Sequence, residues 1–151
     1  MIENSKPKIL LAEDDPINLK LMSRLLTKNG FEFLTANNGE SVYESAVSNP
    51  DIDVILMDIQ MPLLNGYEAT EKIREWENAN NNLKRFKIIA LTAHSFEEEK
   101  RKCLNAGMND FITKPINMPD LIEKIYSDYS DNKPSEENQT ADFSTDLDSD
   151  K

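Results

Sequence analysis

The chain has 151 residues, of which 38% are hydrophobic and 30% are charged, and its formal net charge is −11. This length fits one domain, and the acidic balance argues against direct nucleic-acid binding, which needs Lys and Arg at the phosphates. No apolar run approaches the roughly 18 residues of a membrane span and no secretory signal opens the chain, so we expect no membrane association and a cytoplasmic location, cytosolic or nuclear.

The first two predicted elements are a short strand and an amphipathic helix. The apolar run at Ile9–Ala12 is typical of a strand buried on both faces. From Pro16 to Asn29 the apolar residues fall mostly at helical spacing. Asp15 is placed to cap this helix and Gly30 to end it.

The middle of the chain repeats this order of strand and helix. We expect a strand at 33–36, a helix at about 40–48, a strand at 54–57 and, after the turn residues of 62–66, a helix at about 67–78. The strand at 54–57 is the most apolar and leads directly into Asp58. Asp51 and Asp53 precede it and are interpreted as turn or solvent residues.

The last third of the chain contains a loop, two strands and two helices. A loop at 78–84 precedes a strand at 88–91, and Ser95 with Glu98 predicts a capping box that opens a helix ending at Gly107. Within this helix we interpret Cys103 as a packing residue and 97–99, a run of three Glu, as a solvated face. A strand at 111–112 and a helix from 118 to about 129 follow.

Five alternations of strand and helix predict an α/β domain, in which a parallel sheet carries helices on both faces. We assign residues 1–6 to an N-terminal extension, 7–130 to the domain and 131–151 to a disordered acidic tail. The tail holds seven Asp or Glu, two Lys and one aromatic residue, too little apolar surface to offset its ordering entropy. No second domain pattern follows residue 130, so we expect either a free-standing domain or a piece of a longer protein.

Polar side chains gather where the predicted strands end. Glu13 and Asp14 follow the first strand, Asp58 the third, Thr92 the fourth and Lys114 the fifth. The carboxyl ends of parallel strands are where such sheets place their chemistry. Carboxylates held together repel unless a cation neutralises them or some of them take up protons. Mg²⁺ suits such a site, because it prefers oxygen ligands and leaves positions for phosphate oxygens. An Asp in such a cleft can accept a phosphoryl group as an acyl phosphate.

Four motifs, at 9–15, 56–62, 91–93 and 113–115, resemble the receiver domains of two-component response regulators, and the similarity spans about residues 7–130. The resemblance implies a flavodoxin-like, doubly wound sheet of five parallel strands in the order 2-1-3-4-5 with five helices. The residues at 58–62 and 16–18 are most similar to the corresponding sequences in receivers of hybrid histidine kinases and multistep phosphorelays. By this resemblance the chain is a signalling switch that catalyses only its own phosphorylation and dephosphorylation.

The resemblance also implies roles for the residues of the cleft. Asp58 is the expected phosphoacceptor and Asp14 a direct Mg²⁺ ligand, while Glu13 acts through water and Gln60 offers its backbone carbonyl. Thr92 and Lys114 match the hydroxyl and the ammonium that contact the phosphoryl group, and the Lys114–Pro115 peptide is expected to be cis. Asp15, in contrast, is interpreted as a helix cap.

Two further positions match residues that modulate the family's switch. Phe111 lies where the switch aromatic is found, with a plain core residue as the alternative. His94, together with Gln60, lies where the family tunes the lifetime of the acyl phosphate, with an exposed histidine without chemistry as the alternative. Phosphorylation is expected to change the surface formed by the fourth helix, the fifth strand and the fifth helix.

The resemblance implies a phosphohistidine donor, on either a histidine kinase or a histidine phosphotransfer protein, and a monomer or weak dimer. One alternative is an interaction module of the same fold that is never phosphorylated. A phosphatase with an aspartyl intermediate would need a carboxylate where Gln60 stands, and a flavin-binding module would need a phosphate-cradling loop after the first strand.

Overall fold

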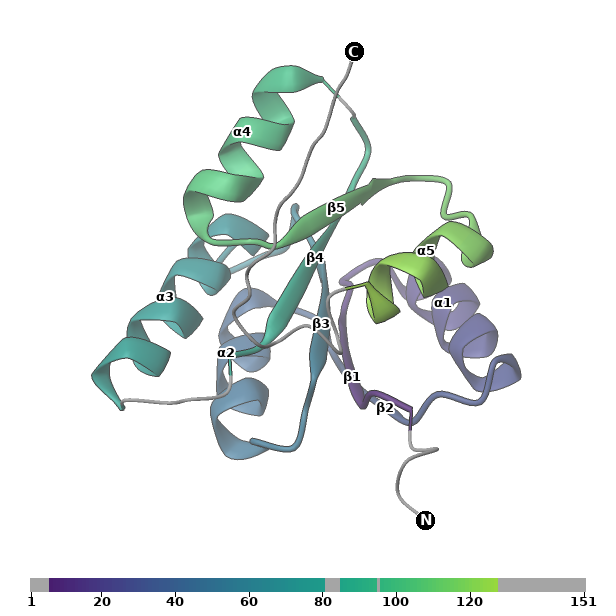
Figure 1. Ribbon diagram of the computed structural model, residues 1–151, viewed down its shortest axis with the longest axis horizontal. Helices are drawn as coiled ribbons and strands as arrows, with labels where there is room; N and C mark the ends of the chain where they lie inside the picture. Colours follow the sequence, from purple (N-terminus) through teal and green to yellow (C-terminus); the bar gives the residue numbers. More distant parts are fainter. Residues whose placement is uncertain (1–5, 81–84, 95, 128–151) are drawn as a thin grey trace.

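The computed structural model describes residues 6–80, 85–94 and 96–127, and within them it forms one five-stranded parallel sheet and five helices (Figure 1). The strand order is β2-β1-β3-β4-β5, so the predicted α/β doubly wound architecture is confirmed. In chain order the elements are β1 (Ile9–Ala12), α1 (Pro16–Lys28), β2 (Phe33–Ala36), α2 (Gly39–Ser48), β3 (Val54–Asp58), α3 (Gly66–Ala79), β4 (Lys87–Thr92), α4 (Glu97–Ala106), β5 (Asp110–Thr113) and α5 (Met118–Tyr126).

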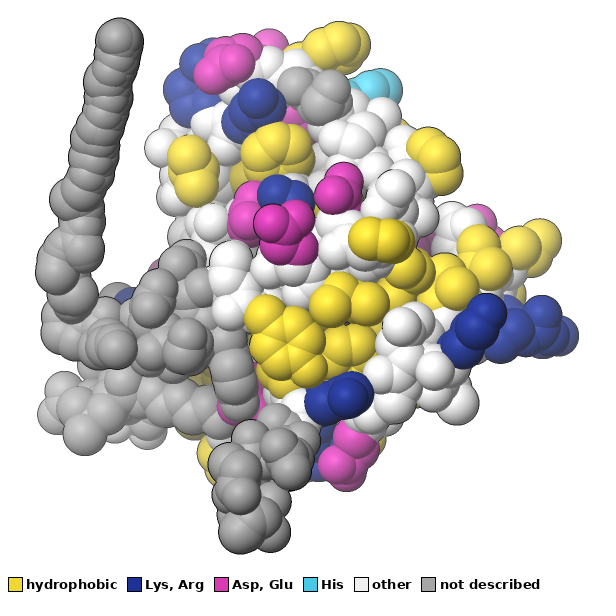
Figure 2. Space-filling model, turned by 45° about the vertical axis from the view of Figure 1, so that its right-hand side comes forward, with side chains coloured by type: hydrophobic (Ala, Val, Ile, Leu, Met, Phe, Trp, Pro, Cys, Tyr) yellow, Lys and Arg dark blue, Asp and Glu magenta, His cyan; other side chains and the backbone are white. Residues whose placement is uncertain are grey.

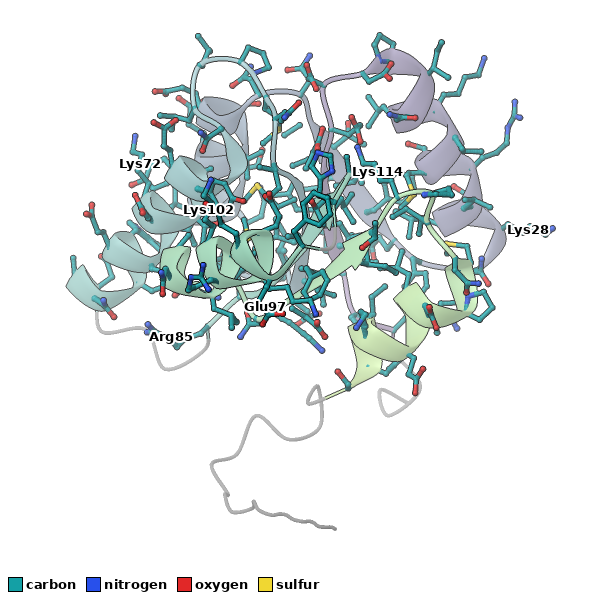
Figure 3. The ribbon with its side chains drawn as sticks, turned by 90° about the horizontal axis from the view of Figure 1, so that it is seen from above. Lys28, Lys72, Arg85, Glu97, Lys102 and Lys114 are labelled. Carbon is teal, nitrogen blue, oxygen red and sulfur yellow. The ribbon has the colours of Figure 1, made fainter. Side chains whose placement is uncertain are left out.

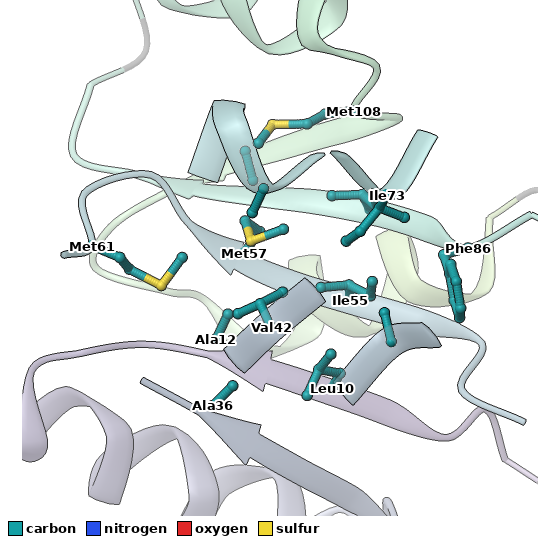
Figure 4. Close-up of a cluster of buried hydrophobic side chains, with 14 of the residues drawn as sticks. Leu10, Ala12, Ala36, Val42, Ile55, Met57, Met61, Ile73, Phe86 and Met108 are labelled. Atoms are coloured by element: carbon teal, nitrogen blue, oxygen red, sulfur yellow. The ribbon is translucent and has the colours of Figure 1, made fainter. Parts of the chain in front are cut away.

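The sheet has helices on both faces, which explains why β1 and β3 are buried at every position. Alternate side chains of a strand point to opposite faces, so Leu10 and Ala12 pack beneath α2, α3 and α4 while Ile9 and Leu11 pack beneath α1 and α5. Figure 4 shows the first of these two layers, which Cys103 joins from α4 as a buried side chain. The two apolar layers therefore fix which side chains of each strand point to each face of the sheet.

Short polar side chains start four of the five helices. Asp15 accepts a hydrogen bond from the backbone N–H of Ile17 at 3.0 Å, which confirms its predicted role as a cap. The capping residues of α2, α3 and α5 are Asn38, Asn65 and Asn117. These contacts position the helices that approach the carboxyl ends of the strands.

The capping box predicted for α4 is wrong. The helix begins at Glu97, and its N-cap is Phe96, which makes no side-chain cap hydrogen bond. Ser95, the residue predicted to cap, lies outside the described residues. The acidic first turn at 97–99 offers a different stabilisation, because negative charge is favourable at the positive end of a helix dipole.

The last helix is shorter than predicted. It ends at Tyr126 instead of near residue 129, and residues 128 and 129 lie outside the described range. Lys87 on β4 donates from its ammonium to the carbonyls of Lys124 and Ser127, where the helix leaves its last carbonyls without helical partners. The predicted extension at 1–6 is described only at residue 6, and the tail at 131–151 lies outside the description. The loop predicted at 78–84 starts later than expected, because α3 continues to Ala79 with Asn80 as its C-cap, and residues 81–84 lie outside the description.

Two glycines hold the loop between β3 and α3 in tight contact with its neighbours. A Cβ on Gly66 would lie 2.5 Å from the carbonyl oxygen of Asp58, so α3 starts directly against the end of β3. A Cβ on Gly39 would lie 2.1 Å from the carbonyl oxygen of Leu64. The loop that carries Gln60 is therefore enclosed between α2 and the strand end.

At the opposite end of the sheet, one arginine joins three segments. Arg74 of α3 donates to the carbonyls of Gly107 and Phe86, both at 2.9 Å, and to the side chain of Asn109 at 2.9 Å. It also pairs with Glu77, which is fully buried and accepts the backbone N–H of Phe86 at 2.8 Å. This network ties α3 to the start of β4 and to the turn between α4 and β5.

Among the residues described, none of the helices has both the length and the hydrophobicity that a membrane crossing requires.

Candidate active site

The strand register brings the predicted site residues to one edge of the sheet. Ala12 pairs with Met57, so Glu13 and Asp58 follow on neighbouring strands. Asp58 pairs with Leu91, and Thr92 pairs with Thr113, so Thr92 and Lys114 come next along the same edge. The Lys114–Pro115 peptide is cis, as expected.

Three carboxylates and one ammonium meet at this edge. Carboxylate oxygens of Glu13, Asp14 and Asp58 all lie within 4.8 Å of one another, with Glu13 and Asp58 buried and Asp14 exposed. The Nζ atom of Lys114 lies 3.4 Å from Glu13 Oε1 and 3.4 Å from Asp58 Oδ1. Figure 3 shows Lys114 over the middle of the fold, whereas Lys28 extends from its edge. The four charged groups line one cleft with a volume of about 590 Å³.

The donor set fits a hard divalent cation. One ammonium leaves the three carboxylates with excess negative charge, and oxygen ligands from one or two carboxylates are what Mg²⁺ commonly uses. Gln60, whose backbone carbonyl was the predicted additional ligand, also lines the cleft. The geometry therefore brings together every residue that the sequence assigned to the metal.

Other acidic residues have different surroundings. Asp15 lines the cleft but uses its carboxylate to cap α1. Asp51 and Asp53 lie before β3, as predicted, and both hold Lys8: Asp53 accepts the backbone N–H at 2.9 Å and Asp51 the ammonium at 2.9 Å. These two contacts fix the start of β3, at the opposite end of the strand from Asp58.

Glu13 is the carboxylate whose protonation responds most to the cleft. Its burial raises its pKa to about 7, and the hydrogen bond and negative charge of Asp58 act in the same direction. The ammonium of Lys114 and the backbone N–H of Asp15 act against this shift. Without a cation, the cleft therefore keeps a proton that an exposed carboxyl group would release.

This shift predicts a pH-dependent difference between the wild type and Glu13→Gln in EDTA. The pKa of Glu13 rises from 4.5 to about 7 on folding, so between these values the folded state binds more protons than the unfolded state. The free energy of unfolding of the wild type should consequently fall, relative to the variant, as pH rises from about 4.5 to 7. Urea unfolding at several pH values measures this difference, and a difference that does not change with pH would contradict the prediction.

Thr92 and His94 form a small backbone unit at the cleft. The Thr92 hydroxyl donates to the carbonyl oxygen of His94 at 3.0 Å and accepts the His94 backbone N–H at 3.1 Å. Thr92 is buried, whereas His94 is exposed and its ring stacks on Phe96 with centroids 5.4 Å apart. Both residues line the cleft, so the structure brings the two predicted positions to the site.

Phe111 is half-buried on β5 and does not line the cleft. The ammonium groups of Lys100 and Lys124 lie 5.4 Å and 5.9 Å from its ring centroid. The ring also contacts the core layer beneath α4. Phe111 is thus placed between the core and the surface of α4 and α5.

One charged residue of the cleft, Glu99, was not predicted from the sequence to lie there. Glu99 belongs to the acidic run that was interpreted as a solvated face, and this interpretation holds for Glu97 and Glu98, which are exposed. Glu99 is half-buried, lines the cleft and accepts a hydrogen bond from the Tyr67 hydroxyl. Helical spacing alone does not reveal this, because the contact depends on how α4 lies against α3.

Comparison with known proteins gives a consistent family. The family model of the response regulator receiver domain matches residues 9–126. Hybrid signal transduction histidine kinase B of Dictyostelium discoideum is 44% identical over 122 residues, which make up 76% of this chain and 6% of that protein. The chain spans between 6% and 15% of the length of such curated relatives.

Two solved structures extend the comparison to three dimensions. A co-crystal of the Saccharomyces cerevisiae histidine phosphotransfer protein Ypd1 and the receiver domain of its response regulator Ssk1 matches with a TM-score of 0.75 and 34% identity, covering 80% of this chain and 87% of that one. The receiver domain of sensor histidine kinase PA1611 from Pseudomonas aeruginosa matches with a TM-score of 0.73 and 35% identity, covering 83% of this chain and 99% of that one. That receiver holds a magnesium ion in its active-site cleft.

Proposed function

The chain belongs to the response regulator receiver domain family, and on that premise we propose that it accepts a phosphoryl group on Asp58 from a phosphohistidine donor. The observation that carries the proposal is the approach of Lys114 Nζ to 3.4 Å from Asp58 Oδ1 within a cluster of three carboxylates. The direct test is incubation with acetyl phosphate and Mg²⁺, followed by mass spectrometry. A phosphoryl group on another residue would contradict the assignment.

The carboxylates of Asp14 and Asp58 and the backbone carbonyl of Gln60 would hold Mg²⁺ directly, with Glu13 acting through water. When bound, the ion supplies the positive charge that lets phosphoryl oxygens enter an acidic cleft. A carboxylate oxygen of Asp58 attacks phosphorus, the bond from phosphorus to the imidazole nitrogen breaks, and the nitrogen keeps the electron pair. The ammonium of Lys114 neutralises part of the charge on the transferring oxygens.

The switch begins with the Thr92 hydroxyl. It now bonds to the His94 backbone, and in the phosphorylated state it turns to donate to a phosphoryl oxygen. Phe111, between the core and the surface, moves inward behind it and changes the face formed by α4, β5 and α5. A partner that prefers the changed face shifts the equilibrium toward it.

Receiver domains are signalling switches, and in this proposal the chain turns over no separate substrate. It catalyses its own phosphorylation and dephosphorylation only. Gln60 and His94 line the cleft and are both exposed, where they can control how water reaches the acyl phosphate. These two side chains therefore set its lifetime.

The donor docks in this proposal on the α1 side of the cleft. Ile17 and Leu21 on α1 are 77% and 53% exposed, and Figure 2 shows apolar surface gathered on the side of α1 and α5 with basic side chains at its edge. A groove of about 160 Å³ starts at Leu21 and reaches Glu13 and Lys114. A phosphotransfer protein with an apolar centre and an acidic rim fits this surface and brings its phosphohistidine to the cleft.

Leu21→Asp should therefore separate protein donors from small donors. Transfer from a phosphorylated histidine phosphotransfer protein should slow at least tenfold, because an apolar anchor at the centre of an interface is replaced by a charge. Labelling by acetyl phosphate should stay within about twofold, since this donor needs no docking surface. Rapid-quench measurement of both reactions gives the two rates.

Leu104→Asp is the matched control. Leu104 lies on α4 and is 63% exposed, so the same change is made away from α1. Transfer from the protein donor should remain at the wild-type rate. Equal slowing by both variants would place the docking surface elsewhere.

A further inference from the structure

Glu99 is a further carboxylate of the acidic cleft, beside the three that cluster there and the helix cap Asp15. It comes from α4, whereas Glu13, Asp14 and Asp58 come from the ends of β1 and β3. It is not a member of the cluster whose oxygens lie within 4.8 Å of one another. Glu99 is therefore a charge at the edge of the cleft that the proposed metal site does not use.

A neighbouring helix anchors this carboxylate. The hydroxyl of Tyr67, the second residue of α3, donates to Glu99 Oε2. The Tyr67 ring packs against the core layer beneath α3 and α4, so its hydroxyl has a fixed place. Burial, followed by the bond to Glu99, raises the pKa of Tyr67, which keeps the phenol protonated as a donor.

Little positive charge compensates Glu99. The ion pairs that line the cleft join Lys114 to Glu13 and Asp58. Within residues 6–80, 85–94 and 96–127 no Lys or Arg forms a salt bridge with Glu99, and its described side-chain partner is the neutral phenol. Among the described residues, the Glu99 carboxylate therefore lines the cleft without an ion-pair partner.

We infer that Glu99, held by Tyr67, is a specificity-determining residue that disfavours small donors in proportion to their negative charge. The inference rests on the proposed phosphorylation of Asp58 and adds to it a selection among donors. A protein donor gains binding free energy at its docking surface, which offsets the repulsion, whereas a free metabolite has only its phosphoryl group. The cleft would thereby respond to its relay partner and resist phosphorylation by dianionic metabolites.

Two small donors of different charge test this selection. Acetyl phosphate is a dianion at neutral pH and loses acetate with the electron pair of the broken P–O bond. Phosphoramidate is largely a monoanion and loses ammonia when its P–N bond breaks. Asp58 attacks phosphorus in both reactions, and the difference between the leaving groups is the same for every variant. A change in the ratio of the two second-order rate constants between wild type and variant therefore reports the effect of donor charge.

In Glu99→Gln the rate constant for acetyl phosphate should rise about two- to fivefold relative to that for phosphoramidate, and the change should shrink at high salt. Tyr67→Phe keeps the ring and removes the anchoring hydroxyl, so it should raise the ratio by a smaller factor. Phosphorylated and unmodified protein are separated on a phosphate-affinity gel at each time point. A ratio that stays at the wild-type value in Glu99→Gln overturns the inference, and an unchanged ratio in Tyr67→Phe alone overturns the anchoring role.

Glu98→Gln is the matched control, because Glu98 carries the same charge on the same helical turn but is exposed and does not line the cleft. It should leave the ratio unchanged, and an equal rise would assign the effect to net charge and overturn the local role. Asp58→Asn distinguishes the selection among donors from the identity of the phosphoacceptor. If Asp58→Asn abolishes labelling but the ratio of rate constants is the same in Glu99→Gln as in the wild type, only the proposed selection among donors is wrong. If labelling persists in Asp58→Asn, the phosphoacceptor assignment is wrong.

Discussion

Asp58→Asn should abolish Mg²⁺-dependent labelling by acetyl phosphate. An amide has nearly the shape of the carboxylate but lacks the charge and the nucleophilic oxygen that form an acyl phosphate. The variant should also be at least as stable as the wild type near pH 7 in EDTA, because Asp58 raises the pKa of the neighbouring Glu13 and repels its charged form. Labelling and urea unfolding are measured on the same preparations.

Asp51→Asn serves as the control for this experiment. Asp51 precedes the same strand and bonds to Lys8 instead of facing the cleft. Its variant should be labelled at the wild-type rate. If Asp58→Asn is still labelled, or if labelling is lost in both Asp58→Asn and Asp51→Asn, the experiment would not support a phosphoacceptor at the end of β3.

Lys114→Gln should slow phosphorylation and tighten Mg²⁺ binding at the same time. The ammonium lies 3.4 Å from oxygens of both Glu13 and Asp58, so its loss removes a charge that stabilises the transferring phosphoryl group. Loss of one such preorganised group commonly slows a reaction by about a hundredfold. The same loss leaves the carboxylates more negative, which favours a divalent cation.

The opposite signs distinguish this role from a structural one. If Lys114 only supported the fold, its replacement would weaken ion binding along with the reaction. Titration calorimetry gives the Mg²⁺ affinity, and the rate of labelling at saturating Mg²⁺ gives the effect on phosphoryl transfer. Weaker Mg²⁺ binding with slower labelling would contradict the assignment.

The sequence predicted the sheet and most of its cleft because both follow from short-range patterns. Strands that are apolar on both faces specify a parallel sheet covered by helices on both sides. In such a sheet the residues that follow each strand lie at the same edge. Glu13, Asp58 and Lys114 therefore needed only their positions after a strand to be placed together. Asp15 was predicted as a cap from its position directly before Pro16.

The features that the sequence did not predict depend on contacts between helices. Periodicity identified the apolar positions of α1, but it did not say that Met22 would be buried while Ile17 and Leu21 remain exposed. The angle of the helix against the sheet decides this. Glu99 was missed for the same reason, since its place in the cleft follows from the packing of α4 on α3 and not from its neighbours in the sequence.

The arginine network described at the far end of the sheet holds the carboxyl end of α4. Arg74 holds the carbonyl of Gly107 directly after the helix, and the left-handed backbone of Gly107 approaches the Arg74 side chain so closely that a Cβ there would lie 2.9 Å from it. The start of α4 follows the loop of Thr92 and His94 instead, next to the cleft. Both ends of α4 are thus tied to α3, so a displacement of its first turn after a change at Asp58 would have to break or carry along the Tyr67–Glu99 hydrogen bond while Arg74 holds the other end.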